Sequence, residues 1–192
     1  IVNAGGELQL AGTPSIGDLD IHDGRLVLAG NSPSVATATA TSLSVTPASS
    51  VAFGSTDTQI SRLTVAGAVS VNGRLDLTLN ASFSAAVNTV FTLIANDASD
   101  PVMGTFAGLP QNSTLVTPLA RFRISYIGGD GNDVTATLVG YGREYLLSEG
   151  AIGTFFTTDI LIANPNDAPA PIHVSFLKPG GGTVEFDDEV AP

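Results

Sequence analysis

The strongest constraint on this chain is a short apolar motif that recurs through residues 1–90. Four related copies follow one another: GELQLAG at 6–12, GRLVLAG at 24–30, SSVAFGS at 49–55 and GRLDLTL at 73–79. Apolar residues two positions apart point to the same face of a strand, so each copy predicts a short strand with one buried side. Their spacing of roughly 18 to 25 residues is typical of the coils of a β-solenoid.

A second series of strands is expected between these copies. LDI at 19–21, LSV at 43–45 and LTV at 63–65 each place two apolar residues on one face. Every coil therefore supplies at least two strands, and Gly and Asx residues between them predict turns with positive φ. One coil cannot bury its own apolar face, so stacked copies are expected to share a continuous core.

The composition favours an all-β chain and excludes several classes of partner. Charged residues make up only 13% of the chain, and cysteine is absent, which excludes disulfides and thiolate sites. The formal charge of −11 and the single lysine, Lys178, argue against nucleic acid and anionic lipid as partners. No apolar run approaches ~20 residues, so membrane insertion is not expected. The chain is interpreted as a processed mature protein or as part of a longer one.

Residues 91–138 contain a distinctive succession of motifs. A hydrophobic strand at 91–94 precedes an Asn-Asp turn, the corner GTFAGLP at 104–110 and the turn GGDGND at 128–133. The succession resembles the closing segment of secreted bacterial surface proteins built from autotransporter-associated β-strand repeats. That resemblance implies a short right-handed parallel β-solenoid over residues 1–140, ended by a capping β-hairpin.

A cap has a physical reason, because an open solenoid end exposes unpaired backbone groups and apolar core. Strands are expected at 90–96, 122–129 and 133–140, the last two joined as a hairpin. Residues 105–118 are expected to cross the end of the solenoid as irregular chain. There Phe106, Leu109 and Leu115 would fill the last coil, each contributing about 1.5–3 kcal/mol if fully buried.

The sequence changes character after residue 140. LSEG at 147–150, FFTTDILIANPN at 155–166 and PIHVSFLKPGG at 171–181 resemble the opening of an immunoglobulin-like or fibronectin-like module. Strands are expected at 145–147, 158–163, 172–176 and 183–186, which is fewer than the ~7 of a complete sandwich. Residues 141–192 therefore predict a partial module that a second subunit, the solenoid or further chain completes.

Two groups of acidic residues are candidate metal sites. Asp130, Asn132 and Asp133 lie in a single copy of the first six positions of a calcium-binding nonapeptide. One copy supplies fewer than the 6–8 oxygens that calcium prefers, which favours a plain hairpin turn. Asp18, Asp20 and Asp23 form the second group, in which Asp18 and Asp20 flank an inward Leu19 and should face water.

Catalysis has little support in the sequence, and the chain is not expected to be an enzyme. Arg25 and Arg74 occupy equivalent positions of the repeat, where a polysaccharide-degrading β-helix would need a basic residue against a carboxylate. His22 and His173 lie in separate modules and are expected to be solvated. The acidic run at 185–189 is expected to be a solvated edge that discourages wrong strand pairing.

Three functions remain at this point. The leading expectation is a secreted or cell-surface structural or adhesive protein that self-associates, as a homo-oligomer or as a filament formed by intermolecular strand addition. The alternative is a module that binds a carbohydrate or a host surface through an aromatic platform, for which Tyr126, Tyr141 and Tyr145 are the only tyrosines. A polysaccharide-degrading enzyme acting through Arg25 or Arg74 is the third.

Overall fold

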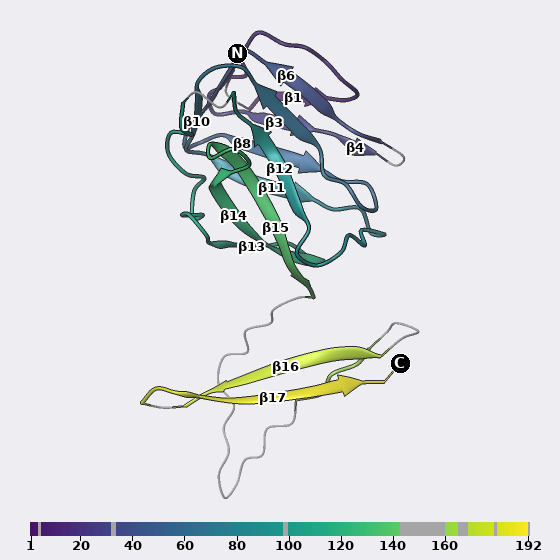
Figure 1. The fold of residues 1–192 in the computed structure, drawn as a ribbon. Coiled ribbons are helices and arrows are strands. Elements are labelled where there is room, and N and C mark those ends of the chain that lie inside the picture. The colour runs from purple at the N-terminus through teal and green to yellow at the C-terminus, as the bar shows by residue number, and fades with distance from the viewer. Residues whose placement is uncertain are drawn as a thin grey trace, which may run out of the picture. The chain divides into compact units, whose positions relative to one another are not determined.

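The computed structural model describes residues 1–3, 5–31, 34–97, 100–142, 160–164, 169–178 and 180–191. The chain divides into two compact units, Ile1–Glu144 and Tyr145–Pro192 (Figure 1). The described residues form strands, turns and extended segments, with no helix among them. The prediction of an all-β chain is therefore confirmed.

The four copies of the apolar motif form one parallel sheet in the larger unit. Its strands are β1 (Glu7–Leu10), β3 (Arg25–Leu28), β8 (Ser50–Gly54) and β11 (Arg74–Thr78), and they lie side by side in that order. The predicted strands are thus confirmed, and their equivalent positions are in register. Two columns of inward side chains result, Leu8, Leu26, Val51 and Leu75 in one and Leu10, Leu28, Phe53 and Leu77 in the other.

The strands of the second series are divided between two further sheets. β2 (Asp18–Ile21), β7 (Ser42–Val45) and β10 (Val69–Val71) form a three-stranded parallel sheet. β9 (Arg62–Val65) instead pairs in parallel with β6 (Thr37–Ala40) and with β12 (Val90–Ala95). Placing LTV at 63–65 in one series with LDI and LSV was therefore wrong, because it lies in a different sheet.

The chain visits the three sheets repeatedly in the same order. β3, β6 and β7 are followed by β8, β9 and β10, each strand pairing in parallel with its predecessor in the same sheet. One repeat thus contains three strands, which agrees with the expectation of at least two. The strand β6 was missed because its inward residues, Ala38 and Ala40, give only a weak apolar alternation.

The inward residues of the three sheets form a single apolar core. Leu26, Leu28 and Phe53 of the first sheet are fully buried, as are Leu43 of the second and Leu63 of the third. Burying a side chain of this size stabilises the fold by about 1.5–3 kcal/mol.

A short hairpin of β4 (Gly30–Asn31) and β5 (Ser34–Val35) follows β3 in the chain.

Beyond β12, the third sheet changes from parallel to antiparallel pairing. β15 (Asp133–Tyr141) pairs with β12, then β14 (Ala120–Gly128) and β13 (Thr114–Val116) follow, which completes six strands. The predicted hairpin of β14 and β15 is confirmed. The expectation of irregular chain throughout 105–118 was wrong, because Leu115 in β13 pairs with Phe122.

The segment between β12 and β13 continues the edges of the other two sheets. Met103 exchanges backbone hydrogen bonds with the β10 edge, of 2.8 Å to Val69 O and 2.9 Å from the Val71 N–H. The N–H of Ala107 donates to the carbonyl of Gly73, just before β11 (2.8 Å). These backbone groups at the edges of the two sheets are therefore paired. Pairing is expected because an unpaired backbone N–H or C=O group is costly when buried.

The smaller unit contains one antiparallel hairpin among its described residues. Its strands are β16 (Ala170–Leu177) and β17 (Thr183–Val190), which confirms the strands expected at 172–176 and 183–186. Described residues 160–164 form no strand, so the strand expected at 158–163 is not found there. The strand expected at 145–147 lies outside the described residues.

Candidate functional site

The end of the larger unit is closed by a buried tyrosine hydroxyl. Tyr126 Oη accepts a 2.9 Å hydrogen bond from the N–H of Phe106 and donates one of 2.7 Å to the carbonyl of Leu109. Phe106 and Leu109 are buried, and Leu115 packs against the core with partial exposure. Burial raises the pKa of the Tyr126 hydroxyl, and the hydrogen bond from Phe106 opposes that rise. The Tyr126 side chain therefore links strand β14 of the cap to residues 106–109, which cross the end of the unit.

The two described tyrosines differ in exposure, with Tyr126 buried and Tyr141 40% exposed to solvent. Tyr126 is 6% exposed. The ring of Tyr141 contacts that of Phe83 in a tilted arrangement, with ring centroids 6.3 Å apart, and its hydroxyl donates to the carbonyl of Ala85 at 2.6 Å. Burial raises the pKa of Tyr141 as well. Tyr145 lies outside the described residues.

The turn between β14 and β15 is hydrogen-bonded to the loop that follows β12. A side-chain oxygen of Asp133 accepts a 2.9 Å hydrogen bond from the N–H of Asn96. The side-chain amides of Asn96 and Asn132 both donate to the carbonyl of Asp100, at 2.7 and 2.9 Å. Asp130 is exposed and takes no part in these contacts. The turn thereby holds the loop that follows β12.

The same turn offers a weak set of metal ligands. The described residues contain no group of three or more His, Cys, Asp or Glu side chains that could hold a metal ion. The side-chain oxygens of Asn96 and Asn132 are buried and unpaired, and the sequence predicted a turn at Asn96 without predicting its position beside Asn132. A Cβ on Gly129 would collide with the carboxylate of Asp133, so this position requires glycine.

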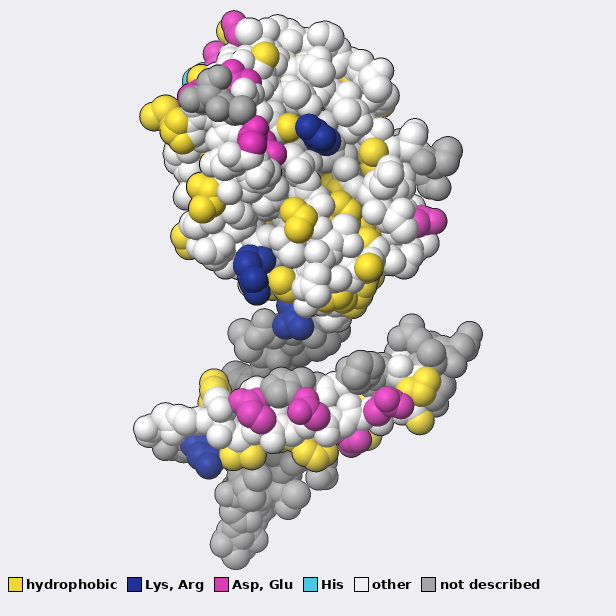
Figure 2. Space-filling view, in the orientation of Figure 1, with side chains coloured by type: hydrophobic (Ala, Val, Ile, Leu, Met, Phe, Trp, Pro, Cys, Tyr) yellow, Lys and Arg dark blue, Asp and Glu magenta, His cyan; other side chains and the backbone are white. Residues whose placement is uncertain are grey.

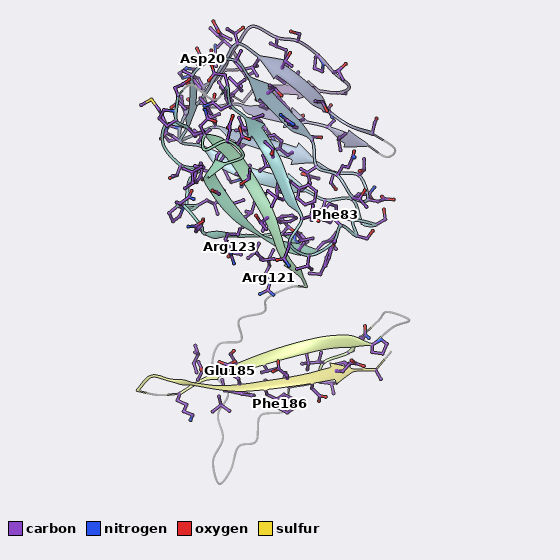
Figure 3. The ribbon with its side chains drawn as sticks, in the orientation of Figure 1. Asp20, Phe83, Arg121, Arg123, Glu185 and Phe186 are labelled. Atoms are coloured by element: carbon purple, nitrogen blue, oxygen red, sulfur yellow. The ribbon has the colours of Figure 1, made fainter. Side chains whose placement is uncertain are left out.

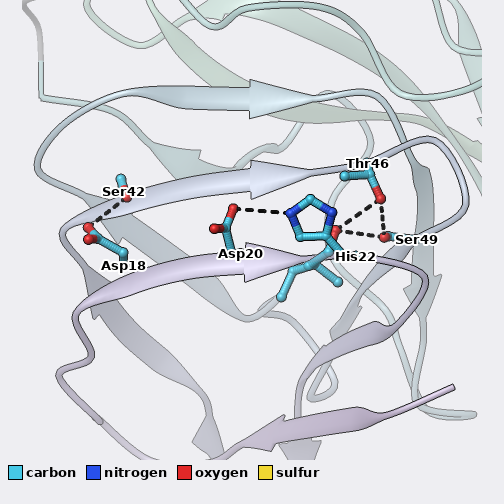
Figure 4. Close-up of polar contacts among 7 residues, drawn as sticks. Asp18, Asp20, His22, Ser42, Thr46 and Ser49 are labelled. Atoms are coloured by element: carbon cyan, nitrogen blue, oxygen red, sulfur yellow. Dashed lines mark hydrogen bonds and ion pairs between the residues drawn. The ribbon is translucent and has the colours of Figure 1, made fainter. Parts of the chain in front are cut away.

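The acidic residues around β2 do not converge on one point (Figure 4). Asp18 accepts a 2.8 Å hydrogen bond from the hydroxyl of Ser42, one strand away. Asp20 lies 3.7 Å from Nε2 of His22, and both side chains are about half exposed to solvent. Asp23 occupies the following turn at a φ of 54°. The side chain of His173 lies outside the described residues.

The two arginines of the first sheet are each paired with a carboxylate. Arg25 lies 4.0 Å from Glu7, and Arg74 lies 2.8 Å from Asp76. The hydrogen bond to Asp76, and then its charge, raise the pKa of Arg74. Glu7 and Asp76 stand on the outermost strands, three strand spacings or roughly 14 Å apart. Two glycosidase carboxylates need about 5 to 9.5 Å, so these two do not form such a pair.

One face of the β16–β17 hairpin is mainly apolar and the other mainly polar, with Asp188 on the first and Leu177 on the second. Val174 lies opposite Phe186, and Phe176 lies opposite Val184. Phe176, Val184 and Phe186 remain 44–50% exposed. The neighbouring positions carry polar residues, including Glu185, which accepts a hydrogen bond from Ser175. In Figure 2, acidic side chains line one side of this hairpin and apolar ones the other.

Comparison with protein-family models, with curated proteins and with solved structures finds no match to this chain. Within the described part of the chain, no helix has the length and apolar character needed to cross a membrane.

Proposed function

We propose that this chain is a non-catalytic, extracellular structural protein that self-associates through its smaller unit. In this proposal residues 1–140 are a right-handed β-solenoid with a hairpin cap, and residues 141–192 are an incomplete immunoglobulin-like module. The repeated order of strands through three sheets supports the solenoid. The right hand follows the usual preference for parallel crossovers.

The observation that carries self-association is the uncovered apolar face of the β16–β17 hairpin. A two-stranded hairpin is marginally stable alone, because it has no second layer on which to bury its side chains. Phe176, Val184 and Phe186 are half-exposed on one face. A second copy offers the same apolar face, so two hairpins can bury these side chains against each other.

The two strands of the hairpin differ in how readily each could pair with a strand from another copy of the chain. β17 carries four carboxylates, at Glu185, Asp187, Asp188 and Glu189, which discourage the addition of another strand. Asn164 also donates a 3.1 Å hydrogen bond to the carbonyl of Val190 on that strand. β16 carries no carboxylate, so we propose that strand addition occurs at β16.

The test is the association state of the full chain over a wide range of concentration. We expect oligomers or filaments by analytical ultracentrifugation and electron microscopy, and their loss in Phe176→Asp. Thr183→Asp is the matched control, since it adds the same charge to the polar face of the same hairpin, opposite Leu177. A wild-type chain that stays monomeric at all concentrations would refute the proposal, as would equal loss of assembly in both variants.

A further inference from the structure

The three sheets of the larger unit differ in the charge that they present to solvent. β2 contributes Asp18 and Asp20 to the three-stranded sheet, whose strands carry no basic residue. The four-stranded sheet carries Arg25 and Arg74, and both are paired with carboxylates. The six-stranded sheet is the exception, because its outward face is basic.

The basic residues of the six-stranded sheet are Arg62 on β9 and Arg121 and Arg123 on β14. All three are exposed, and none makes an ion pair or side-chain hydrogen bond among the described residues. The only acidic residue on the strands of this sheet is Asp133, which is buried and accepts the N–H of Asn96. These arginines are therefore uncompensated cations of the six-stranded sheet, in a chain whose net charge is −11.

Arg121 and Arg123 form the centre of this basic face. They lie two residues apart on one side of β14, roughly 7 Å along the strand. Figure 3 labels both beside β14, and Figure 2 shows basic side chains there with apolar and uncharged surface around them. Arg62 lies three strands away, roughly 14 Å across the sheet, so only an extended ligand could contact all three.

The cross-strand neighbours of the arginines include threonine hydroxyls, the half-exposed Val116 opposite Arg121 and the backbone of Gly140. Arg123 lies opposite Thr114 of β13 and Thr137 of β15, and Thr64 is the second residue after Arg62 on β9. Guanidinium groups bind carboxylates and sulfates through two parallel hydrogen bonds, and threonine hydroxyls can donate to or accept from sugar hydroxyls.

We propose that this face binds an acidic polysaccharide, with Arg121 and Arg123 holding its carboxylate or sulfate groups and Arg62 a more distant one. Nucleic acid fits less well, because the aromatic rings of this sheet, at Phe91, Phe122 and Tyr126, are buried and offer no stacking surface. This proposal concerns the larger unit and does not depend on self-association of the smaller one.

The experiment measures retention of the full chain on immobilised polygalacturonate and heparin, with dextran as a neutral polymer and single-stranded DNA as a fourth ligand. Comparing polygalacturonate with heparin distinguishes recognition of carboxylate groups from recognition of sulfate groups. We expect binding to one or both acidic polysaccharides that weakens with salt, and an affinity about tenfold lower in Arg121→Gln/Arg123→Gln. Adding Arg62→Gln should weaken binding to the longer polymers further.

Arg25→Gln/Arg74→Gln is the matched control, because it removes the same number of positive charges from the four-stranded sheet. We expect it to bind as the wild type does, and equal melting temperatures should show that both double variants remain folded. Absence of binding to both acidic polysaccharides, equal weakening in the control, equal retention on dextran, or preference for DNA would each overturn the proposal.

Discussion

The hydroxyl of Tyr126 donates a 2.7 Å hydrogen bond to the carbonyl of Leu109, across 17 positions of sequence. Its oxygen also accepts a hydrogen bond from the N–H of Phe106. One side chain therefore pairs with two backbone groups of the segment that crosses the end of the unit. Both backbone groups lie at buried residues, where an unpaired polar group is costly. The cap thus depends on a specific polar contact as well as on apolar burial.

Replacing Tyr126 by Phe should destabilise the larger unit by about 1–3 kcal/mol, because it leaves the Phe106 N–H and the Leu109 carbonyl unpaired. Urea unfolding of the full chain measures the change. Ser42→Ala removes an exposed hydrogen bond to Asp18 and should cost less than about 0.5 kcal/mol. Equal stability of the Tyr126 variant and the wild type would contradict the assigned role.

Stability should fall at alkaline pH. The pKa values of Tyr126 and Tyr141 are raised by burial in the folded chain, so the folded state retains protons that the unfolded state loses above about pH 10. The stabilising contribution is therefore complete below that pH and is lost as the pH rises through the folded values. Urea midpoints at pH 8 and pH 11 test this. The decline should be shallower in Tyr126→Phe, with the remainder due to Tyr141.

A contact between two glycines allows β4 to lie against β8. A Cβ on Gly54 would collide with the backbone nitrogen of Gly30. Gly54→Ala should therefore destabilise the fold by about 1–3 kcal/mol, since the backbone must shift. A Cβ on Gly17 would meet only open space, and the φ of Gly17 is not positive, so Gly17→Ala should change stability by less than about 0.5 kcal/mol. Thermal melting distinguishes these outcomes.

Removal of the Asp133 carboxylate should loosen the loop after β12. Asp133→Ala leaves the N–H of Asn96 without its acceptor, and we expect a loss of about 1–3 kcal/mol. Asp130→Ala, at an exposed position of the same turn, should cost less than about 0.5 kcal/mol. Millimolar calcium should leave the melting temperature of the wild type unchanged, and a marked rise would instead favour calcium binding at this turn.

Several elements could be predicted because their signals are local. GRLVL and GRLDL contain the alternation of a half-buried strand, and β3 and β11 form there. FRISYIGG and DVTATLVG flank a glycine-rich turn, and β14 and β15 pair across it. Phe106 and Leu109 were expected to fill the end of the core, and both are buried.

Other features depended on partners that are distant in the sequence. Asp23–Gly24 was expected to turn through positive φ, and Asp23 does so, whereas Gly24 is needed because a Cβ there would lie 2.7 Å from Val2. Asn96 and Asp100 joined the GGDGND turn only in three dimensions. The arginines of β9 and β14 likewise share a face only because β15 and β12 lie between them.

The sequence by itself determined the strands with a clear apolar alternation, among them β3, β11, β14 and β15, and which side of each is apolar, because side-chain alternation is a property of neighbouring residues. The tertiary structure decided which strands share a sheet, as the separation of LTV in β9 from LSV in β7 shows. It also decided which charges stay unpaired, since Arg25 lies 4.0 Å from Glu7 of the neighbouring strand while Arg123 lies beside Thr137. Sheet membership and charge pairing between strands depend on backbone segments that are distant in the sequence. The alternation of apolar and polar residues within one strand does not show which distant strand will pair with it.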